Sequence, residues 1–150
     1  MHDDDIGIFI AHMRDPEART MAAFTAEDPD DVAGEAARWV RIRNDPDNLT
    51  RTVLADGQVA GHVASFVIEG EREITYWIDR EWWGRGVATE ALRLLLDLDP
   101  VRPLHARVAE DNVGSRTVLE RCGFRQTRRD RGYAAGRGHE IDELILQLDG

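Results

Sequence analysis

The chain has 150 residues, of which 42% are hydrophobic and 32% charged, and its formal net charge is -10. A chain of this length forms one domain with its own core, and no apolar run is long enough to cross a membrane. The acidic balance argues against general nucleic-acid binding, which needs a positive face to displace counterions. All 19 basic side chains are arginines, which excludes a Schiff-base lysine and the lysine of a nucleotide-binding phosphate loop.

The N-terminus and the cysteine content indicate a cytoplasmic protein. Residues 1–5 are acidic, whereas secretory and organellar targeting segments are basic. Cys122 is the only cysteine, so no disulfide can form within the chain. No repeat, low-complexity tract or flexible linker divides the sequence, and we expect residues 1–150 to form a single domain.

The first half of the sequence predicts two helices and then three antiparallel strands. Apolar residues recur at helical spacing over residues 6–14 and again over residues 30–44. On the second helix the expected apolar face comprises Ala33, Ala36, Ala37 and Val40. The β-rich stretches that follow, the first two of them joined by the hairpin signal Asp56-Gly57, are residues 50–55, 58–68 and 73–78.

The second half predicts a parallel strand pair connected through a helix. Apolar residues at helical spacing begin at Val87 and end before Asp99. A short strand over residues 104–108 follows, and a crossover helix of this kind makes the strands on either side of it parallel. A helix capped by Asn112 and ended by Gly123 comes next, before a final hairpin over residues 124–129 and 141–148. The order is ααβββαβαββ, an α+β domain with a mixed sheet.

The most informative segment lies between a strand and a helix: Trp82-Trp83-Gly84-Arg85-Gly86-Val87-Ala88-Thr89. Glycine lets the backbone approach a ligand, and the free N–H groups in the first turn of a helix attract anions. Three interpretations are open: a dinucleotide loop, a pyrophosphate loop of another kind, and an ordinary turn. The dinucleotide fingerprint fails because Thr89 takes the place of its third glycine.

A second segment, which starts at Asn112 and ends at Phe124, follows the second parallel strand. Together the two segments resemble the Gcn5-related N-acetyltransferase (GNAT) family and, within it, the RimJ/RimL-like branch of ribosomal-protein N-terminal acetyltransferases. Gly86 and Ala88 match the acetyl-CoA loop of that family, Q/R-x-x-G-x-G/A, with Trp83 in the first place. The pattern Asn-x-x-Ser followed by Leu-Glu-x-x-Gly-Phe is similar to the next family motif.

This resemblance implies a GNAT fold in which two parallel strands splay apart around acetyl-CoA. It implies an enzyme that moves the acetyl group to a primary amine by direct attack in a ternary complex. The pyrophosphate would lie on the N–H groups of residues 84–89, and the thioester carbonyl would face a strand N–H near Ile78. The implied cofactor-binding residues are Trp77, Ile78, Trp83, Gly84, Arg85, Gly86, Val87, Ala88, Thr89, Asn112, Ser115 and Arg116.

Acetyl transfer to an amine needs a base for the amine and an acid for the departing thiolate. By resemblance Glu73 is the base, directly or through water, and a solvated charge at the end of a strand is its alternative role. His62 is the second candidate base. Ser115 matches a serine that protonates the thiolate in some members, and a hydrogen bond to the backbone is its alternative role. Tyr133 is the second candidate acid.

Other residues also have both a structural and a functional interpretation. Asn112 is expected to cap a helix and, by resemblance, to bind the pantetheine amides. Seven arginines between residues 114 and 137 suit the cofactor's 3′-phosphate, most directly through Arg85 and Arg116, or an acidic partner or a solvated face. Cys122 is expected to pack in the core. The spacing of histidines and cysteines indicates no metal site.

The remaining expectations concern partners. Family members usually carry a strand before the first helix, and here that strand is shortened or missing, so the neighbouring strand edge would be exposed and a homodimer would cover it. The acidic first half suits a small cationic amine or a basic peptide or protein N-terminus as acceptor. The alternative function is a non-catalytic acyl-CoA-binding or protein-interaction module. Neither a nucleic acid nor a membrane is expected as a partner.

Overall fold

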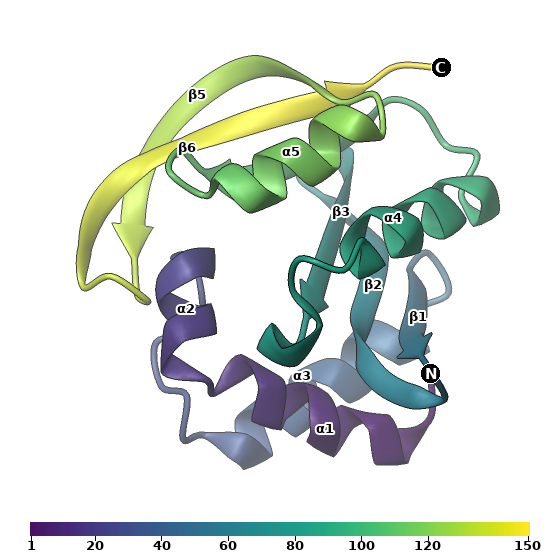
Figure 1. Ribbon diagram of the computed structural model, residues 1–150, viewed down its shortest axis with the longest axis vertical. Helices are drawn as coiled ribbons and strands as arrows, with labels where there is room; N and C mark the ends of the chain where they lie inside the picture. The colour runs from purple at the N-terminus through teal and green to yellow at the C-terminus, as the bar shows by residue number, and fades with distance from the viewer.

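The computed structural model describes residues 1–150 as one six-stranded sheet with helices on both of its faces (Figure 1). The helices are α1 (Asp3–Met13), α2 (Pro16–Ala22), α3 (Val32–Asn44), α4 (Val87–Leu98) and α5 (Val113–Arg121), with a 3-10 turn, η1 (Arg80–Trp82). The strands are β1 (Leu49–Ala55), β2 (Gln58–Ile68), β3 (Glu71–Ile78), β4 (Leu104–Ala109), β5 (Arg125–Ala134) and β6 (His139–Leu148). The strand order is β1-β2-β3-β4-β6-β5, and only β3 and β4 pair in parallel. The predicted α+β domain with a mixed sheet is confirmed.

Three helices precede β1, where the sequence predicted two. The additional helix, α2, begins at Pro16, and the carboxylate of Asp15 caps it by accepting a hydrogen bond from the N–H of Glu17 at 3.4 Å. An acid at the cap and a proline at the first helical position are both helix-start signals. The short Asp-Pro-Glu pattern is thus a signal for α2 that the sequence analysis missed, and the helix is only 7 residues long.

Two further details differ from the prediction. The buried residue of α3 is Trp39, whereas Ala33, Ala37 and Val40 are exposed, so the predicted apolar face of this helix is wrong. The indole of Trp39 packs against the ring of Phe9 at a centroid distance of 5.6 Å, and this large ring sets the orientation of the helix. The C-terminal hairpin is longer than predicted, because residues 132–134 pair with residues 139–141 and do not form a loop.

Different helices cover the two faces of the sheet. α4 and α5 pack on one face, where their leucines meet apolar side chains of β2, β3, β4 and β6 in the main core. α1 and α3 cover the opposite face at β2, with Ile6, Ile10 and Trp39 in a smaller cluster (Figure 1). None of the helices combines the length and the apolar character that a membrane crossing requires.

The hairpin of β5 and β6 reaches across to α2 (Figure 1). The N–H of Gly136 donates to the carbonyl of Ala23 at 2.8 Å, and Arg137 donates to the carbonyl of Thr20. A Cβ atom on Gly136 would lie 2.2 Å from the carbonyl oxygen of Arg19, so the close approach requires glycine. The first helices and the last hairpin thus meet beside the end of β4, over a buried cluster of Ala23, Ala109 and Ala134.

The parallel strands β3 and β4 pair at a single register, Glu73 opposite His105, and separate beyond it. Successive residues of β3 direct their backbone groups to opposite sides, and the N–H of Asp79, just after the strand, donates to β2 at 2.8 Å. The N–H groups of Tyr76 and Ile78 therefore point toward β4, where no strand pairing engages them. This is the splayed parallel pair that the resemblance implied.

Candidate active site

The glycine loop between η1 and α4 has the backbone geometry of an anion site. Gly84 and Gly86 have φ angles of +74° and +78°, which favour glycine, and Gly86 is the N-cap of α4. The N–H groups of Val87, Ala88 and Thr89 form the first turn, where no intrahelical acceptor is present. Nothing lies within 4 Å of the Cβ position on either glycine, so the loop is open to a ligand. The pyrophosphate could approach this positive helix end.

The side chains around the loop are fixed by contacts within the protein. The indole N–H of Trp83 donates to the carbonyl of Ile78 at 2.8 Å, so this carbonyl, which faces β4, is already engaged. The guanidinium of Arg85 lies 5.0 Å from the ring centroid of Trp82 and forms no ion pair. Arg85 is therefore free to contact a phosphate. Trp77 directs its backbone N–H and C=O toward β2, so these two groups do not face the separation of β3 and β4.

Ser115 has a hydroxyl partner that the sequence analysis missed. Asn112 caps α5 by accepting the N–H of Ser115 at 3.2 Å, and its side-chain N–H donates to the carbonyl of Met21 at 3.3 Å. The hydroxyl of Ser115 lies 2.5 Å from that of Tyr76 on β3. Burial raises the pKa of Tyr76 to about 12, so its phenol remains protonated at neutral pH. Tyr133, the predicted second acid, is 60% exposed on β5 and is not hydrogen-bonded to Ser115.

The two predicted bases lie in different environments. Glu73 is buried at the paired end of β3 and β4, and its Oε1 accepts a hydrogen bond from Nε of Arg107 at 3.0 Å. Arg107 also donates to Glu143 at 3.1 Å, and burial raises the pKa of Glu143. His62 is buried against the ring of Phe9 at 4.9 Å, and burial lowers the pKa of His62 to about 3. His62 is thus a neutral core residue.

The positive charge expected from the arginines of residues 114–137 is largely neutralised. Counting along the sequence missed the acids that folding brings beside them, because those acids come from β3, β6 and the turn after β4. The ion pairs are Arg125 with Asp149, Arg128 with Glu71, Arg129 with Glu110 and Asp142, Arg131 with Glu140 and Asp142, and Arg137 with Asp111. Arg116, expected at the 3′-phosphate, donates to the carbonyl of Glu110 at 3.1 Å.

Cys122 does not lie in the environment of a nucleophile, and no group of side chains is arranged to hold a metal ion. Cys122 packs at the edge of the main core, and burial raises the pKa of its thiol, which disfavours the nucleophilic thiolate. No three of the histidine, cysteine, aspartate and glutamate side chains are grouped as a metal ion would require.

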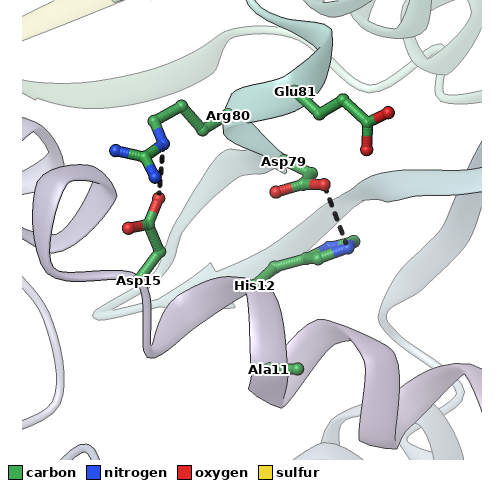
Figure 2. A pocket seen from close by; sticks show the side chains of 6 residues that line it. All are labelled: Ala11, His12, Asp15, Asp79, Arg80 and Glu81. Atoms are coloured by element: carbon green, nitrogen blue, oxygen red, sulfur yellow. Dashed lines mark ion pairs between the residues drawn. The ribbon is translucent and has the colours of Figure 1, made fainter.

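An open pocket of about 540 Å³ lies between α1 and the connection from β3 to α4, and Figure 2 shows the side chains that line it. These are Ala11, His12, Asp15, Asp79, Arg80 and Glu81. Two contacts between a basic and an acidic side chain cross the pocket: His12 Nε2 lies 3.8 Å from Asp79 Oδ2, and Arg80 Nε lies 3.2 Å from Asp15 Oδ2 (Figure 2). No sequence pattern indicates this group, because His12 and Asp79 are separated by two helices and three strands.

A splayed parallel strand pair that leads into a glycine loop at a helix N-terminus defines an acyl-CoA-dependent acyltransferase fold. The family model described as "Acetyltransferase (GNAT) domain" matches residues 1–125. The chain belongs to the GNAT acetyltransferase family, and it is an N-acetyltransferase that uses acetyl-CoA.

Two relatives of known sequence carry the name N-acetyltransferase. "Putative ribosomal N-acetyltransferase YdaF" of Bacillus subtilis (strain 168) is 31% identical over 115 residues, which cover 69% of this chain and 61% of YdaF. "Uncharacterized N-acetyltransferase p20" of Bacillus licheniformis is 24% identical over 161 residues, which cover 99% of this chain and 89% of p20.

Solved structures share the fold over the whole chain. The ribosomal-protein-alanine N-acetyltransferase of Brucella melitensis superposes with a TM-score of 0.84 at 20% identity, covering 100% of this chain and 97% of that one. The structure of yncA from Salmonella typhimurium, with its cofactor acetyl-CoA, has a TM-score of 0.81 at 18% identity and covers 99% of this chain and 90% of that one.

Proposed function

We propose that this enzyme acetylates a primary amine, either a peptide or protein N-terminus or a small cationic amine, by direct attack on acetyl-CoA in a ternary complex. The observation that carries the proposal is the placement of an open acidic pocket at one end of β3, beside the separation of β3 and β4. Three carboxylates, Asp15, Asp79 and Glu81, line this pocket against one arginine, Arg80. The names of YdaF and of the Brucella protein support a protein N-terminus as acceptor.

We assign the cofactor to the separation between β3 and β4 and to the loop that follows β3. The N–H groups of residues 84–89 and the side chain of Arg85 bind the pyrophosphate in this proposal. The pantetheine arm lies along β3, and the thioester oxygen accepts the free N–H of Ile78, which stabilises the oxyanion of the tetrahedral intermediate. Titration calorimetry with acetyl-CoA, coenzyme A and NAD tests this assignment. Binding of both coenzyme A forms but not of NAD is expected.

Ser115 is our proposed acid for the departing thiolate, with Tyr76 as the group that resupplies its proton. We expect Ser115→Ala to lower kcat by about 100-fold, at the lower end for general acids because a thiolate is a good leaving group. The affinity for acetyl-CoA is expected to stay unchanged. Release of the free thiol under saturating acetyl-CoA measures kcat. Thr117→Ala, which removes an exposed hydroxyl from the same helix, is the matched control, and equal losses in both variants would refute the role of Ser115.

The acceptor itself is found with a panel of four amines: alaninamide, serinamide, the tripeptide amide Ala-Arg-Ala and spermidine. Acetylation is followed by mass spectrometry of each amine. We expect the two members that carry more than one positive charge, the tripeptide and spermidine, to react with the lower KM, because the pocket carries more acids than bases. Binding of acetyl-CoA without acetylation of any member would count against the proposed function.

We further propose that a second copy of the chain covers the edge strand β1. This strand pairs only with β2, so its outer backbone groups lack strand partners, and Leu54 on it is 65% exposed. Light scattering at several concentrations is expected to report a dimer. A monomer at all concentrations would remove this part of the proposal.

A further inference from the structure

His12 occupies a position in the pocket that its helical packing does not explain. Only 11% of its side chain is exposed, and its Nδ1 atom is buried without a hydrogen-bond partner. Nδ1 of the core residue His62 also lacks a partner, but His12 differs from His62 because it lines the open pocket, where its ring can meet a ligand. The other ring nitrogen, Nε2, is directed at Asp79 across the pocket (Figure 2).

The distance between His12 and Asp79 suits a small cation held by both. At 3.8 Å, Nε2 and Oδ2 are too far apart for a direct hydrogen bond. One ammonium nitrogen at about 2.9 Å from each atom would donate to both, since an ammonium carries several N–H groups. The second ion pair of the pocket leaves these two atoms free, because Arg80 is held by Asp15 and Glu17.

The same two residues lie next to the proposed reacting centre. Asp79 directly follows Ile78, the residue whose free N–H is assigned to the thioester oxygen. The N–H of Asp79 donates to the carbonyl of Ala60 at 2.8 Å, which fixes the backbone at the end of β3. An amine bound between His12 and Asp79 therefore lies at the end of the strand along which the thioester is placed.

We infer that His12 is the base that takes the proton from the acceptor's ammonium group, with Asp79 holding the ammonium against it. The inference rests on the proposed function and gives that site its base. Imidazole is the side-chain base that exchanges protons near neutral pH, and a neutral ring accepts through one nitrogen. Five titratable or charged side chains face His12. They are His62 from β2, Asp15 from the turn that follows α1, and Asp79, Arg80 and Glu81 from the connection after β3.

The proton and electron balance of the step is complete with these groups. The ammonium gives one proton to Nε2 of His12, and the freed lone pair forms the N–C bond to the acetyl carbon. The C–S bond then breaks as the tetrahedral oxyanion collapses. His12 releases this first proton to water through the open pocket and then accepts the second proton from the attacking nitrogen, while the departing thiolate gains a proton from Ser115.

This assignment makes His12 the base, which is the role that the resemblance implied for Glu73. The carboxylate of Glu73 is hydrogen-bonded to Arg107 at the paired end of β3 and β4, five residues before Ile78 along the strand. Its function in this view is to hold Arg107 in place. The two assignments make opposite predictions for the variants His12→Gln and Glu73→Gln.

The test compares His12→Gln and Glu73→Gln with the wild-type chain, using the panel amine that the wild type acetylates fastest. We expect His12→Gln to lower kcat by about 100-fold or more. Its affinity for acetyl-CoA should equal that of the wild type, and Glu73→Gln should keep most of the turnover. His139→Gln, an exposed histidine of the C-terminal hairpin, is the control and should be fully active. Added imidazole should restore turnover to His12→Ala, whereas pyrazole, of the same size but far less basic, should not.

The possible results separate the inference from the proposed function. A wild type that binds acetyl-CoA but acetylates no panel amine refutes the proposed function and the inference with it. An active wild type with an equally active His12→Gln, or with loss of turnover only in Glu73→Gln, overturns the inference alone. If both His12 variants unfold, histidine ring signals in NMR spectra of the wild type decide. Spermidine must then shift the signals of His12 and leave those of His139 in place, and unchanged His12 signals overturn the inference.

Discussion

Replacing Gly86 by glutamate is expected to weaken acetyl-CoA binding by about 100-fold or more, which is roughly 3 kcal/mol. Two effects act together. The φ angle of +78° at the N-cap of α4 strains any residue with a Cβ atom. The new carboxylate also lies at the helix N-terminus and repels the pyrophosphate from the N–H groups of Val87 and Ala88. Titration calorimetry with acetyl-CoA measures the loss directly.

Gly57→Glu separates these two effects. Gly57 has a φ of +76° with nothing within 4 Å of its Cβ position, as at Gly86, but it lies in the turn between β1 and β2. Both variants should therefore lose similar stability, and only the variant at Gly86 should lose the cofactor. Tight acetyl-CoA binding by Gly86→Glu would mean that residues 84–89 are only a turn.

Replacing Asp99 by alanine is expected to destabilise the fold by about 3–5 kcal/mol. Its buried carboxylate accepts hydrogen bonds from Oγ of Ser65 at 2.5 Å and from Nε of Arg72 at 2.7 Å. Without it, Arg72 is left as a largely buried cation and Ser65 loses its acceptor. For a chain of this size the melting temperature should fall by roughly 6–20 °C. Asp149→Asn, at an exposed pair with Arg125, should change it little.

The destabilisation by Asp99→Ala should depend on pH. Burial acts to raise the pKa of Asp99, but the hydrogen bonds from Ser65 and Arg72 outweigh it and hold the pKa below its ordinary value. A depressed pKa stabilises the fold above the pKa of the unfolded chain, about 3.9, and the stabilisation is lost as the pH falls through the folded value. Wild type and variant should therefore differ most in urea unfolding at neutral pH and converge below about pH 4. A constant difference would show that Asp99 acts through packing.

Local patterns in the sequence predicted the elements that depend on local physics. The β-rich stretches of β2 and β3, the helical spacing after Gly86 and the cap at Asn112 each depend on neighbouring residues, and each was predicted near its observed position. The two motifs also predicted the splayed strands. In α3 the prediction failed because Trp39 buries more surface than several alanines, and only the packing partners on α1 and β2 reveal that.

Local sequence patterns could not predict the side-chain pairs of the candidate site. Tyr76 meets Ser115, and His12 meets Asp79, across 39 and 67 residues of chain, and neither pair has a sequence spacing that marks it. The ion pairs of the arginine-rich segment were missed for the same reason. Glu73 was found by resemblance, but its bond to Arg107 depends on the register of β3 and β4. The comparison of Glu73→Gln with His12→Gln decides whether Glu73 has the role of base that the resemblance implied.

The contact between Arg137 and Thr20 has a consequence for how the molecule folds. It joins groups 117 residues apart in sequence, whereas β3, α4, β4 and α5, where we propose that the cofactor binds, lie within residues 71–121. Contacts distant in sequence form late, because a long loop must close before they contribute. During synthesis the cofactor half can therefore assemble first. The contact between α2 and the last hairpin forms only when that hairpin has emerged and closed onto α2.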